Sequence, residues 1–453
     1  MLLRFRCKNF RSIREEQELS LVAAKTRSDE RKDSLLDTPL KGVHALRCAA
    51  IYGANASGKS NVLHAMRVFS RMVSKSQRQW NPTGGISTWD PFVLDEISRT
   101  GETEFQIDFV VGLRVYNYGF RFNRAVFVEE WLKDITEREK QLFRRTTKDS
   151  TISAEFPGRN LGATVEDASH LNTIKLQTRP NSLFLSSAAQ NNHEQLATIF
   201  KWIVDGFQII FPLGQSWRLH TADYCTTPQR KEKIKALLAF ADVGIVDLEV
   251  SDKELPENIR GLLTQTDKLI KGVEADTVSG LMNPSSLFHD IKMTHRIADG
   301  KLYFLDFENE SKGTRTYFAL LGPLLDILED GTLVLIDELE ASLHPKLARQ
   351  LVRIFNDPVL NPKGAQLIFA THDTNLLDLD LMRRDQIWFT EKNENGATVL
   401  MPLSDYKPRK DQNIEAAYLH GRFGALPFLD ESLLYEALES PNKKSSVFGD
   451  EAR

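Results

Sequence analysis

The sequence predicts an α/β fold in which a mixed sheet is combined with antiparallel strands and a compact, mostly helical insertion. A short apolar run, Ala45–Tyr52, ends at a glycine-rich turn, and helical spacing follows over Asn61–Ser74. Helical patterns also dominate the segment from about Asn192 to Gly272. Three alternating segments, separated by turn residues, are typical of antiparallel strands: Phe105–Val111, Val115–Phe122 and Val126–Lys133.

The chain of 453 residues is 41% hydrophobic and 26% charged, which is ordinary for a globular protein of two or three domains. No run approaches about 18 apolar residues, and the N-terminus lacks the apolar core of a secretory signal. The three cysteines, Cys7, Cys48 and Cys225, are far apart and form no CxxC metal pair. We therefore expect a protein of the reducing cytoplasm without a membrane partner.

Charge is unevenly distributed along the chain. The net charge is −4, but the first 80 residues hold 16 Lys/Arg against 7 Asp/Glu, so +9 there leaves −13 for the rest. A basic region of this kind suits an anionic partner such as DNA, RNA or nucleotide. A solvated surface with a few phosphate-binding residues is the simpler interpretation.

The remaining elements follow from periodicity and turn residues. Leu2–Phe10 is expected to be an edge strand, and Gln17–Ala23 a second strand. Further helices are expected at Gln195–Phe207, Arg230–Phe240, Glu257–Leu269, Arg315–Leu328 and Pro345–Phe355. Further strands are expected at Ile245–Val250, His295–Phe307, Leu333–Ile336 and Gln366–Thr371.

The glycine-rich turn matches the phosphate-loop pattern G-x-x-x-x-G-K-[ST] in full. The residues expected to bind nucleotide here are Gly53, Ala54, Asn55, Ala56, Ser57, Gly58, Lys59, Ser60 and Asn61. The glycines let backbone N–H groups converge on phosphate oxygens, and the following helix adds its positive N-terminal end. Lys59 is expected to bridge the β- and γ-phosphates, and the Ser60 hydroxyl to hold Mg²⁺. The pattern therefore predicts ATP and Mg²⁺ as cofactors.

A second motif joins the apolar strand Leu333–Ile336 to two carboxylates, Asp337 and Glu338. Four consecutive apolar residues suit a strand that is buried on both faces. Asp337, at the end of this strand, is expected to reach Mg²⁺. Glu338 is expected to polarise the attacking water as general base. Together with the phosphate loop, the pair predicts a Walker B motif.

The order of the motifs resembles that of ABC-type ATPases, in which the glutamate after the Mg²⁺ aspartate is catalytic. Upstream, Ser311–Arg315 opens a predicted helix and resembles the ABC signature in the reduced form of SMC-like heads. This resemblance implies nucleotide contacts from Ser311, Gly313 and Thr314. Downstream, Leu339–Pro345 resembles a D-loop, and His372 resembles the switch histidine that senses the γ-phosphate. The fold class is therefore expected to be an ABC-type ATPase head.

The long gap between the two halves of the head predicts an insertion. Lys59 and Asp337 are 278 residues apart, far more than an uninterrupted ABC head needs. No sustained heptads occur, so we expect a compact lobe instead of a long coiled coil. The expected division is 1–140 for the N-terminal half with the phosphate loop, 141–300 for the mainly helical insertion lobe, 301–435 for the C-terminal half with the signature, Walker B motif, D-loop and switch histidine, and 436–453 for a flexible tail.

Several shorter strings extend the resemblance to a particular family. They are Asn9–Ser12, Pro91–Leu94, Glu129–Leu132, Arg179–Ser186 and Tyr418–Pro427. They look like stand-alone ABC-type (SMC/RecF/OLD-like) ATPases of bacterial phage-defence systems, of the RloA and AbiL type, with PARIS AriA and Septu PtuA as relatives. The resemblance implies a homodimer or higher homo-oligomer, formed through ATP-bound heads, that controls a separately encoded nuclease or toxin in antiphage defence.

Other interpretations stay open. A RecF/SMC-like DNA repair ATPase would place the basic first 80 residues on DNA, and RNA is a further candidate. An OLD-like ATP-dependent nuclease needs a nuclease domain, but only about eighty residues follow His372. Arg11 lies either near the nucleotide, as in similar ATPases, or on the surface. No glutamine occurs in Trp89–Leu94, so the Q-loop is unassigned, and Gly421–Gly424 is either a structural turn or an interaction element.

Overall fold

A computed structural model describes most of the chain. The described residues are 1–25, 34–157, 161, 164–210, 215–241, 244–252, 289–297, 299–341, 343–409, 412–426 and 431–438. The predicted helix Glu257–Leu269, Ser342 and most of the predicted tail lie outside these residues. Within the described residues, no helix is both long and apolar enough to cross a membrane.

A six-stranded mixed sheet forms the centre of the molecule, with strand order β11-β15-β16-β5-β17-β18. Its strands are Phe207–Ile210 (β11), Leu333–Ile336 (β15), Gln366–Ala370 (β16), Cys48–Gly53 (β5), Ile387–Lys392 (β17) and Thr398–Pro402 (β18). The first five are parallel to one another, and β18 is antiparallel to β17. Every residue of β5, β15 and β16 is buried, which explains their continuous apolar character.

A second sheet is wholly antiparallel and has seven strands in the described chain, in the order β10-β9-β8-β7-β6-β1-β2. Its strands are Thr151–Glu155 (β10), Lys140–Lys148 (β9), Phe127–Asp134 (β8), Arg114–Phe122 (β7), Thr103–Val111 (β6), Leu2–Lys8 (β1) and Gln17–Ser20 (β2). The three predicted antiparallel strands are thus confirmed. Two short strands, Leu35–Asp37 (β3) and His44–Leu46 (β4), pair separately.

The prediction that Leu2–Phe10 is an edge strand is wrong, because β1 pairs with β6 on one side and with β2 on the other. The alternation of this segment alone predicts a strand at the edge of a sheet. Instead, Arg4 and Arg6 each pair with Asp108 of β6 and Glu18 of β2. These cross-strand ion pairs let charged side chains lie on an interior strand.

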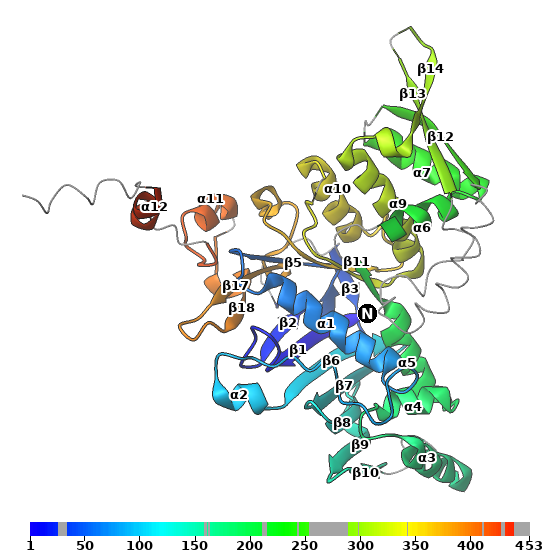
Figure 1. Ribbon diagram of the computed structural model, residues 1–453, viewed down its shortest axis with the longest axis vertical. Helices are drawn as coiled ribbons and strands as arrows, with labels where there is room; N and C mark the ends of the chain where they lie inside the picture. The colour runs from blue at the N-terminus through cyan, green and yellow to red at the C-terminus, as the bar shows by residue number, and fades with distance from the viewer. Residues whose placement is uncertain are drawn as a thin grey trace, which may run out of the picture.

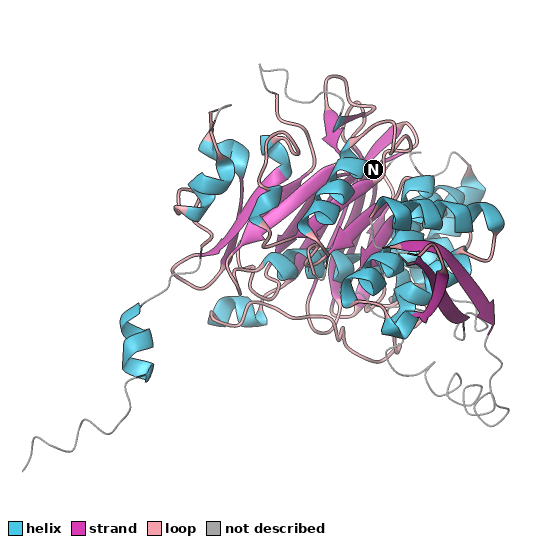
Figure 2. Ribbon diagram, turned by 90° about the horizontal axis from the view of Figure 1, so that it is seen from above, coloured by secondary structure: helices cyan, strands magenta, loops and turns pink. Residues whose placement is uncertain are grey.

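Some of the helices cover the two faces of the central sheet, and others, such as α12, lie away from it (Figure 1). Their bounds are Lys59–Lys75 (α1), Glu96–Thr100 (α2), Val165–Gln177 (α3), Phe184–Gln190 (α4), Glu194–Gly206 (α5), Gln215–Tyr224 (α6), Pro228–Phe240 (α7), Lys312–Asp330 (α9), Pro345–Asn356 (α10), Ile414–Leu419 (α11) and Glu431–Leu438 (α12). Leu333 and Leu335 pack in one core with α1 and the antiparallel sheet, whereas Val334 and Ile336 pack in another with α9 and α10. Helix α1 therefore lies between the two sheets (Figure 1), and helices flank the strands in the view from above (Figure 2).

The described residues between 141 and 300 contribute to both layers of the fold. Strands β9 and β10 continue the antiparallel sheet, and β11 joins the central sheet beside β15. Helices α4 and α5 belong to the first core, and α6 and α7 to the second. A small three-stranded sheet packs near α7 and consists of Ile245–Asp252 (β12), His289–Arg296 (β13) and Leu302–Asp306 (β14). The domain boundaries at 140 and 300 stay a prediction.

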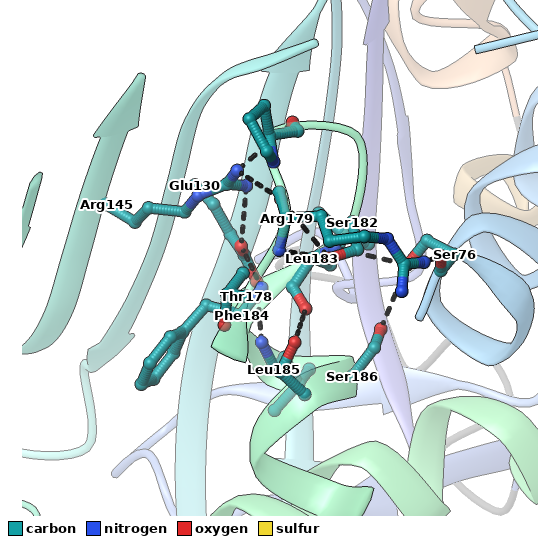
Figure 3. Close-up of polar contacts among 12 residues, drawn as sticks. Ser76, Glu130, Arg145, Thr178, Arg179, Ser182, Leu183, Phe184, Leu185 and Ser186 are labelled. Atoms are coloured by element: carbon teal, nitrogen blue, oxygen red, sulfur yellow. Dashed lines mark hydrogen bonds and ion pairs between the residues drawn. The ribbon is translucent and has the colours of Figure 1, made fainter. Parts of the chain in front are cut away.

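A buried carboxylate fastens α4 to the antiparallel sheet (Figure 3). Glu130 of β8 has no exposed surface. Its Oε2 accepts a hydrogen bond from the backbone N of Phe184 at 2.6 Å, and its Oε1 accepts from the N of Leu185 at 3.0 Å and the Tyr118 hydroxyl at 2.9 Å. The first backbone N–H groups of a helix have no partner within the helix, so Glu130 satisfies two of them with a charge that suits the helix dipole.

The partner of Glu130 is the equally buried Arg145, directly opposite on β9. Their closest atoms, Arg145 Nη1 and Glu130 Oε2, are 3.6 Å apart, so the two side chains form an ion pair without a hydrogen bond. Arg145 Nη2 donates to the carbonyls of Arg179 and Pro180, both at 3.1 Å. Arg179 in turn donates to the carbonyl of Ser76 at the end of α1. The strings Glu129–Leu132 and Arg179–Ser186 thus form one anchoring cluster.

Candidate functional site

The predicted site residues follow the ends of three adjacent parallel strands. Strand β5 leads into the phosphate loop, β15 into Asp337 and Glu338, and β16 into His372. Because β16 pairs with both β15 and β5, the carboxyl ends of all three strands meet at one edge of the sheet. Leu339 N donates to the carbonyl of Ala370 at 3.2 Å, and Thr371 N to that of Ile51 at 3.1 Å. These bonds continue the strand pairing into the three loops.

Threonine side chains of the neighbouring strands β17 and β18 form hydrogen bonds with the phosphate loop. The hydroxyls of Ser57 and Thr390 are 2.6 Å apart, and the Thr398 hydroxyl donates to the carbonyl of Ser57 at 2.8 Å. Gly58 has a φ of 114° and caps α1, and a Cβ added there would collide with the Thr398 side chain. A Cβ at Gly53 would collide with Thr390 and Ser57. Both glycines of the motif are therefore required by close packing as well as by conformation.

Lys59 begins α1 and is 7% exposed. Its Nζ donates to the carbonyls of Gly53 at 2.8 Å and Ala54 at 3.0 Å, so the ammonium group sits within the loop. Burial lowers the pKa of Lys59, and the negative charges of Asp337, Glu340 and Glu338 oppose this effect. The cation and the carboxylates after β15 therefore interact at the same edge of the sheet.

The carboxylates after β15 differ in their surroundings. Asp337 Oδ1 is buried and has no hydrogen-bond partner among the described residues. An unpartnered buried carboxylate oxygen beside a phosphate loop suits a hard cation such as Mg²⁺, which proteins hold through few carboxylates and substrate phosphates. Ser60 is exposed in the first turn of α1, and its role as the second protein ligand stays a prediction. Glu338 is exposed and adopts a left-handed φ of 53°, which is uncommon for a residue other than glycine.

His372 follows β16, and its side chain has no hydrogen-bond partner among the described residues. Burial lowers the pKa of His372, as does the nearby charge of Lys59, while Glu340, Glu338 and Asp337 act in the opposite direction. The imidazole is thus near both the loop lysine and the carboxylates.

Sequence reasoning missed the role of Glu340. Its Oε1 accepts from the backbone N of His372 at 2.6 Å, and its Oε2 from the Thr371 hydroxyl at 2.5 Å. Glu340 had appeared only as part of the predicted D-loop string. No local pattern could have revealed it, because its partners lie 31 and 32 residues further along the chain.

Arg11 lies beside the first turn of α1. Its Nε is 2.9 Å from Asp90 Oδ2, and its Nη1 is 3.4 Å from the side-chain oxygen of Asn61. Asn61 in turn donates to the Ser12 hydroxyl at 2.7 Å. The segment Trp89–Leu94, which contains no glutamine for a Q-loop, thus supplies Asp90 as the partner of Arg11. The side chain of Arg11 is 38% exposed, so it is both a surface residue and a neighbour of the loop helix.

The predicted signature begins α9, as expected. The Ser311 hydroxyl accepts from the backbone N of Thr314 at 3.0 Å and lies 2.8 Å from the Thr314 hydroxyl. Ser311 and Lys312 are exposed, Gly313 is half-buried and Thr314 is buried. Ser311 is therefore the cap of this helix within one chain. Contacts with a nucleotide on a second chain stay a prediction.

The string Gly421–Gly424 forms a turn that closes against β17. Gly421 and Gly424 have φ values of 78° and 64°. Phe423 is fully buried and stacks on Phe389 with ring centres 5.3 Å apart, and the Tyr406 hydroxyl donates to the Phe423 carbonyl at 3.0 Å. Between the two interpretations, this packing supports the structural turn.

A phosphate loop after one parallel strand, with carboxylates and a histidine after the two strands beside it, defines the ABC-type ATPase head. A family model described as "AAA domain, putative AbiEii toxin, Type IV TA system" matches residues 48–378, more than half of the chain. The chain belongs to this family. The predicted α/β fold of an ABC-type ATPase head is confirmed, whereas the SMC-like character and the phage-defence relatives stay a prediction.

Two solved structures are similar at low identity. The SMC head domain from Thermotoga maritima has a TM-score of 0.37 and 11% identity, covering 88% of this chain and 98% of that chain. The SmcHead bound to the C-winged helix domain of ScpA has a TM-score of 0.37 and 13% identity, covering 90% of this chain and 99% of that chain. No curated protein matches the chain.

Proposed function

We propose that this protein binds ATP with Mg²⁺ and hydrolyses it to ADP and phosphate. The observation that supports this best is the meeting of Lys59, Asp337 and His372 at the ends of three adjacent parallel strands. The family, which is described as an AAA domain, supports the same activity. A bound Mg²⁺ would neutralise the charge that develops on the phosphates.

In this proposal the chain's own residues have separate roles. The loop from Gly53 to Ser60 binds the phosphates through its backbone N–H groups, and Lys59 neutralises them. Ser60 and Asp337 hold the metal ion. Glu338 activates the attacking water as general base, and His372 contacts the γ-phosphate.

Two variants separate binding from hydrolysis. Lys59→Ala removes the cation within the loop and is expected to abolish ATP binding in calorimetry. Glu338→Gln leaves Lys59, Ser60 and Asp337 in place, so it should bind ATP normally but hydrolyse it about 10²–10⁴-fold more slowly. Wild-type affinity and turnover in the first variant would remove the phosphate-loop assignment. Normal turnover in the second would mean that another residue activates the water.

We further propose that ATP closes two heads into a dimer, with Ser311, Gly313 and Thr314 of one chain facing the phosphate loop of the other. The exposed Ser311 at the start of α9 supports this, since a helix N-terminus attracts phosphate. Ser311→Arg should keep ATP binding in the single head but block closure and hydrolysis. In a heterodimer of Ser311→Arg and Lys59→Ala, one of the two shared sites combines an intact phosphate loop with an intact Ser311–Thr314 segment. Mixing the two variants should therefore restore part of the ATP hydrolysis. A mixture that forms heterodimers and stays inactive would contradict the shared site.

The nucleotide state of the dimer is proposed to control a separately encoded nuclease or toxin in antiphage defence. The family description, which names a toxin–antitoxin system, supports an effector of this kind. The test is to purify the chain with the product of the adjacent gene and to compare complex formation and effector activity with ATP and with ADP. An effector that is equally active with wild type and with Lys59→Ala would contradict nucleotide control.

A further inference from the structure

A single carboxylate organises the turn that carries the switch histidine. Glu340 binds the backbone N of His372 at 2.6 Å through one oxygen and the Thr371 hydroxyl at 2.5 Å through the other. The Thr371 hydroxyl also accepts from the backbone N of Asp373 at 3.0 Å. Glu340, which follows β15, therefore fixes Thr371 and His372 directly. It also fixes Asp373 through the Thr371 hydroxyl.

These contacts engage the backbone of His372 and leave its ring free. Among the described residues, the imidazole of His372 has no hydrogen-bond partner, while its N–H is held by the short bond to Glu340. Bonds to an ionised acceptor are stronger than neutral ones, so a carboxylate is well suited to fix the turn. Thr371 is fully buried, which shields its bond to Glu340 from competing water.

We propose that Glu340 is a positioning residue for ATP hydrolysis: it holds the Thr371–His372 turn so that the His372 ring meets the γ-phosphate. This inference rests on the proposed function. Glu338 differs from Glu340 in its surroundings. Glu338 is exposed, and its side chain forms no hydrogen bond with any of the described residues. Both oxygens of Glu340 already accept hydrogen bonds, which suits a fixed anchor and not a base that must take up a proton from water.

The test compares steady-state hydrolysis in Glu340→Ala, Glu340→Gln and the matched control Glu338→Gln. The amide of Gln can accept from His372 N and, through its NH₂ group, donate to the Thr371 hydroxyl, so it preserves the geometry without the charge. We expect kcat to fall about 10²-fold in Glu340→Ala, as misplaced catalytic groups typically cost, and to recover to within about 10-fold of wild type in Glu340→Gln. The KM for ATP and the affinity for ADP, which lacks the γ-phosphate, should stay within about 3-fold. Thr371→Val, which removes only the hydroxyl, should lower kcat less than Glu340→Ala.

The outcomes distinguish this inference from the proposed function. A wild-type chain without ATP hydrolysis would overturn the proposed function, and this inference with it. An active wild type with an inactive Glu338→Gln and an unchanged Glu340→Ala would overturn the role of Glu340 alone. Equal losses in Glu340→Gln and Glu338→Gln would show that Glu340 acts through its charge or as a base, which also contradicts positioning. If Glu340→Ala does not fold, as judged by lost ADP binding, Thr371→Val decides, and wild-type kcat in that variant counts against the proposal.

Discussion

Removing the Glu130 carboxylate should strongly destabilise the protein. Glu130→Ala leaves the guanidinium of Arg145 buried without its counter-ion, and it leaves the backbone N–H groups of Phe184 and Leu185 without an acceptor. Burial raises the pKa of Glu130, and the charge of Arg145 opposes this shift. Burial is costly for both charges of this pair, so each side chain depends on the other for compensation.

The size of the effect follows from burial. Breaking a fully buried ion pair by removing one partner typically costs about 3–5 kcal/mol of unfolding free energy, because the other charge stays buried. The neighbouring residues supply a matched control. Arg144 pairs with Glu129 at 2.7 Å on the same two strands, but its side chain is 53% exposed. Glu129 keeps its second partner, Arg121, and a partly exposed pair contributes about 0–1 kcal/mol, so Arg144→Gln should be nearly neutral.

Urea unfolding, followed by tryptophan fluorescence, measures the difference in unfolding free energy between Glu130→Ala and Arg144→Gln. Two tryptophans close to Glu130 report on this part of the fold. Trp131 is next to Glu130 on β8, and Trp80 stacks on Phe127 of the same strand with ring centres 6.0 Å apart. The double variant Glu130→Leu/Arg145→Met should be more stable than Glu130→Ala, since no unpaired charge remains. A loss in Glu130→Ala as small as that in Arg144→Gln would refute the reasoning.

Three further predictions concern the loop, a histidine and the C-terminal turn. Gly58→Ala should abolish ATP binding in calorimetry, because the new Cβ collides with Thr398, whereas Gly42→Ala, at a φ of 71° with nothing within 4 Å, should leave ATP binding unchanged. Burial, aided by the charge of Arg11, lowers the pKa of His64 to about 4. In the unfolded chain the pKa of His64 is about 6.5. Between pH 6.5 and 4, His64 is therefore protonated in the unfolded chain but neutral in the folded chain. From pH 7 to 5 the free energy of unfolding should fall by at most about 2 kcal/mol through His64, because water screens this half-buried ring. The urea midpoint of His64→Gln should depend less on pH. Phe423→Ala removes a fully buried ring and should cost about 3–5 kcal/mol in the same urea assay, while a loss below about 1 kcal/mol would contradict the packed turn.

The sequence predicted those parts of the fold whose signal is local. Strand β15 has the predicted bounds. Its four apolar residues stand between a glycine-containing turn and two carboxylates, and these polar neighbours mark both ends of the strand. Helix α1 begins within the phosphate loop as the motif requires. Strands β9 and β10 were missed, because their exposed polar residues alternate with few apolar ones. Arg145 illustrates this, since a buried arginine in such a strand looks like any surface residue until its partner across the sheet is known.

The site was predictable to the extent that it depends on motifs. The loop residues, Asp337 and His372 lie in or directly after strands whose apolar character marks them as buried. Glu340 was not predictable, because its main partner is a backbone N–H group, and backbone groups carry no sequence signal. Asp90 was missed for a similar reason. Its contact with Arg11 depends on a loop whose path is set by packing and not by composition.

The C-terminal segment connects two sides of the same site. On one side, the Thr374 hydroxyl, two residues after His372, donates to Glu415 of α11 at 2.6 Å. On the other side, Tyr418 of α11 stacks on Phe389 of β17 with ring centres 5.5 Å apart, and the next residue of that strand, Thr390, holds Ser57 of the phosphate loop. Helix α11 therefore contacts both the turn after His372 and the strand that supports the phosphate loop. Because packed side chains are not freely deformable, a shift of the His372 turn that moves Thr374 must also disturb α11.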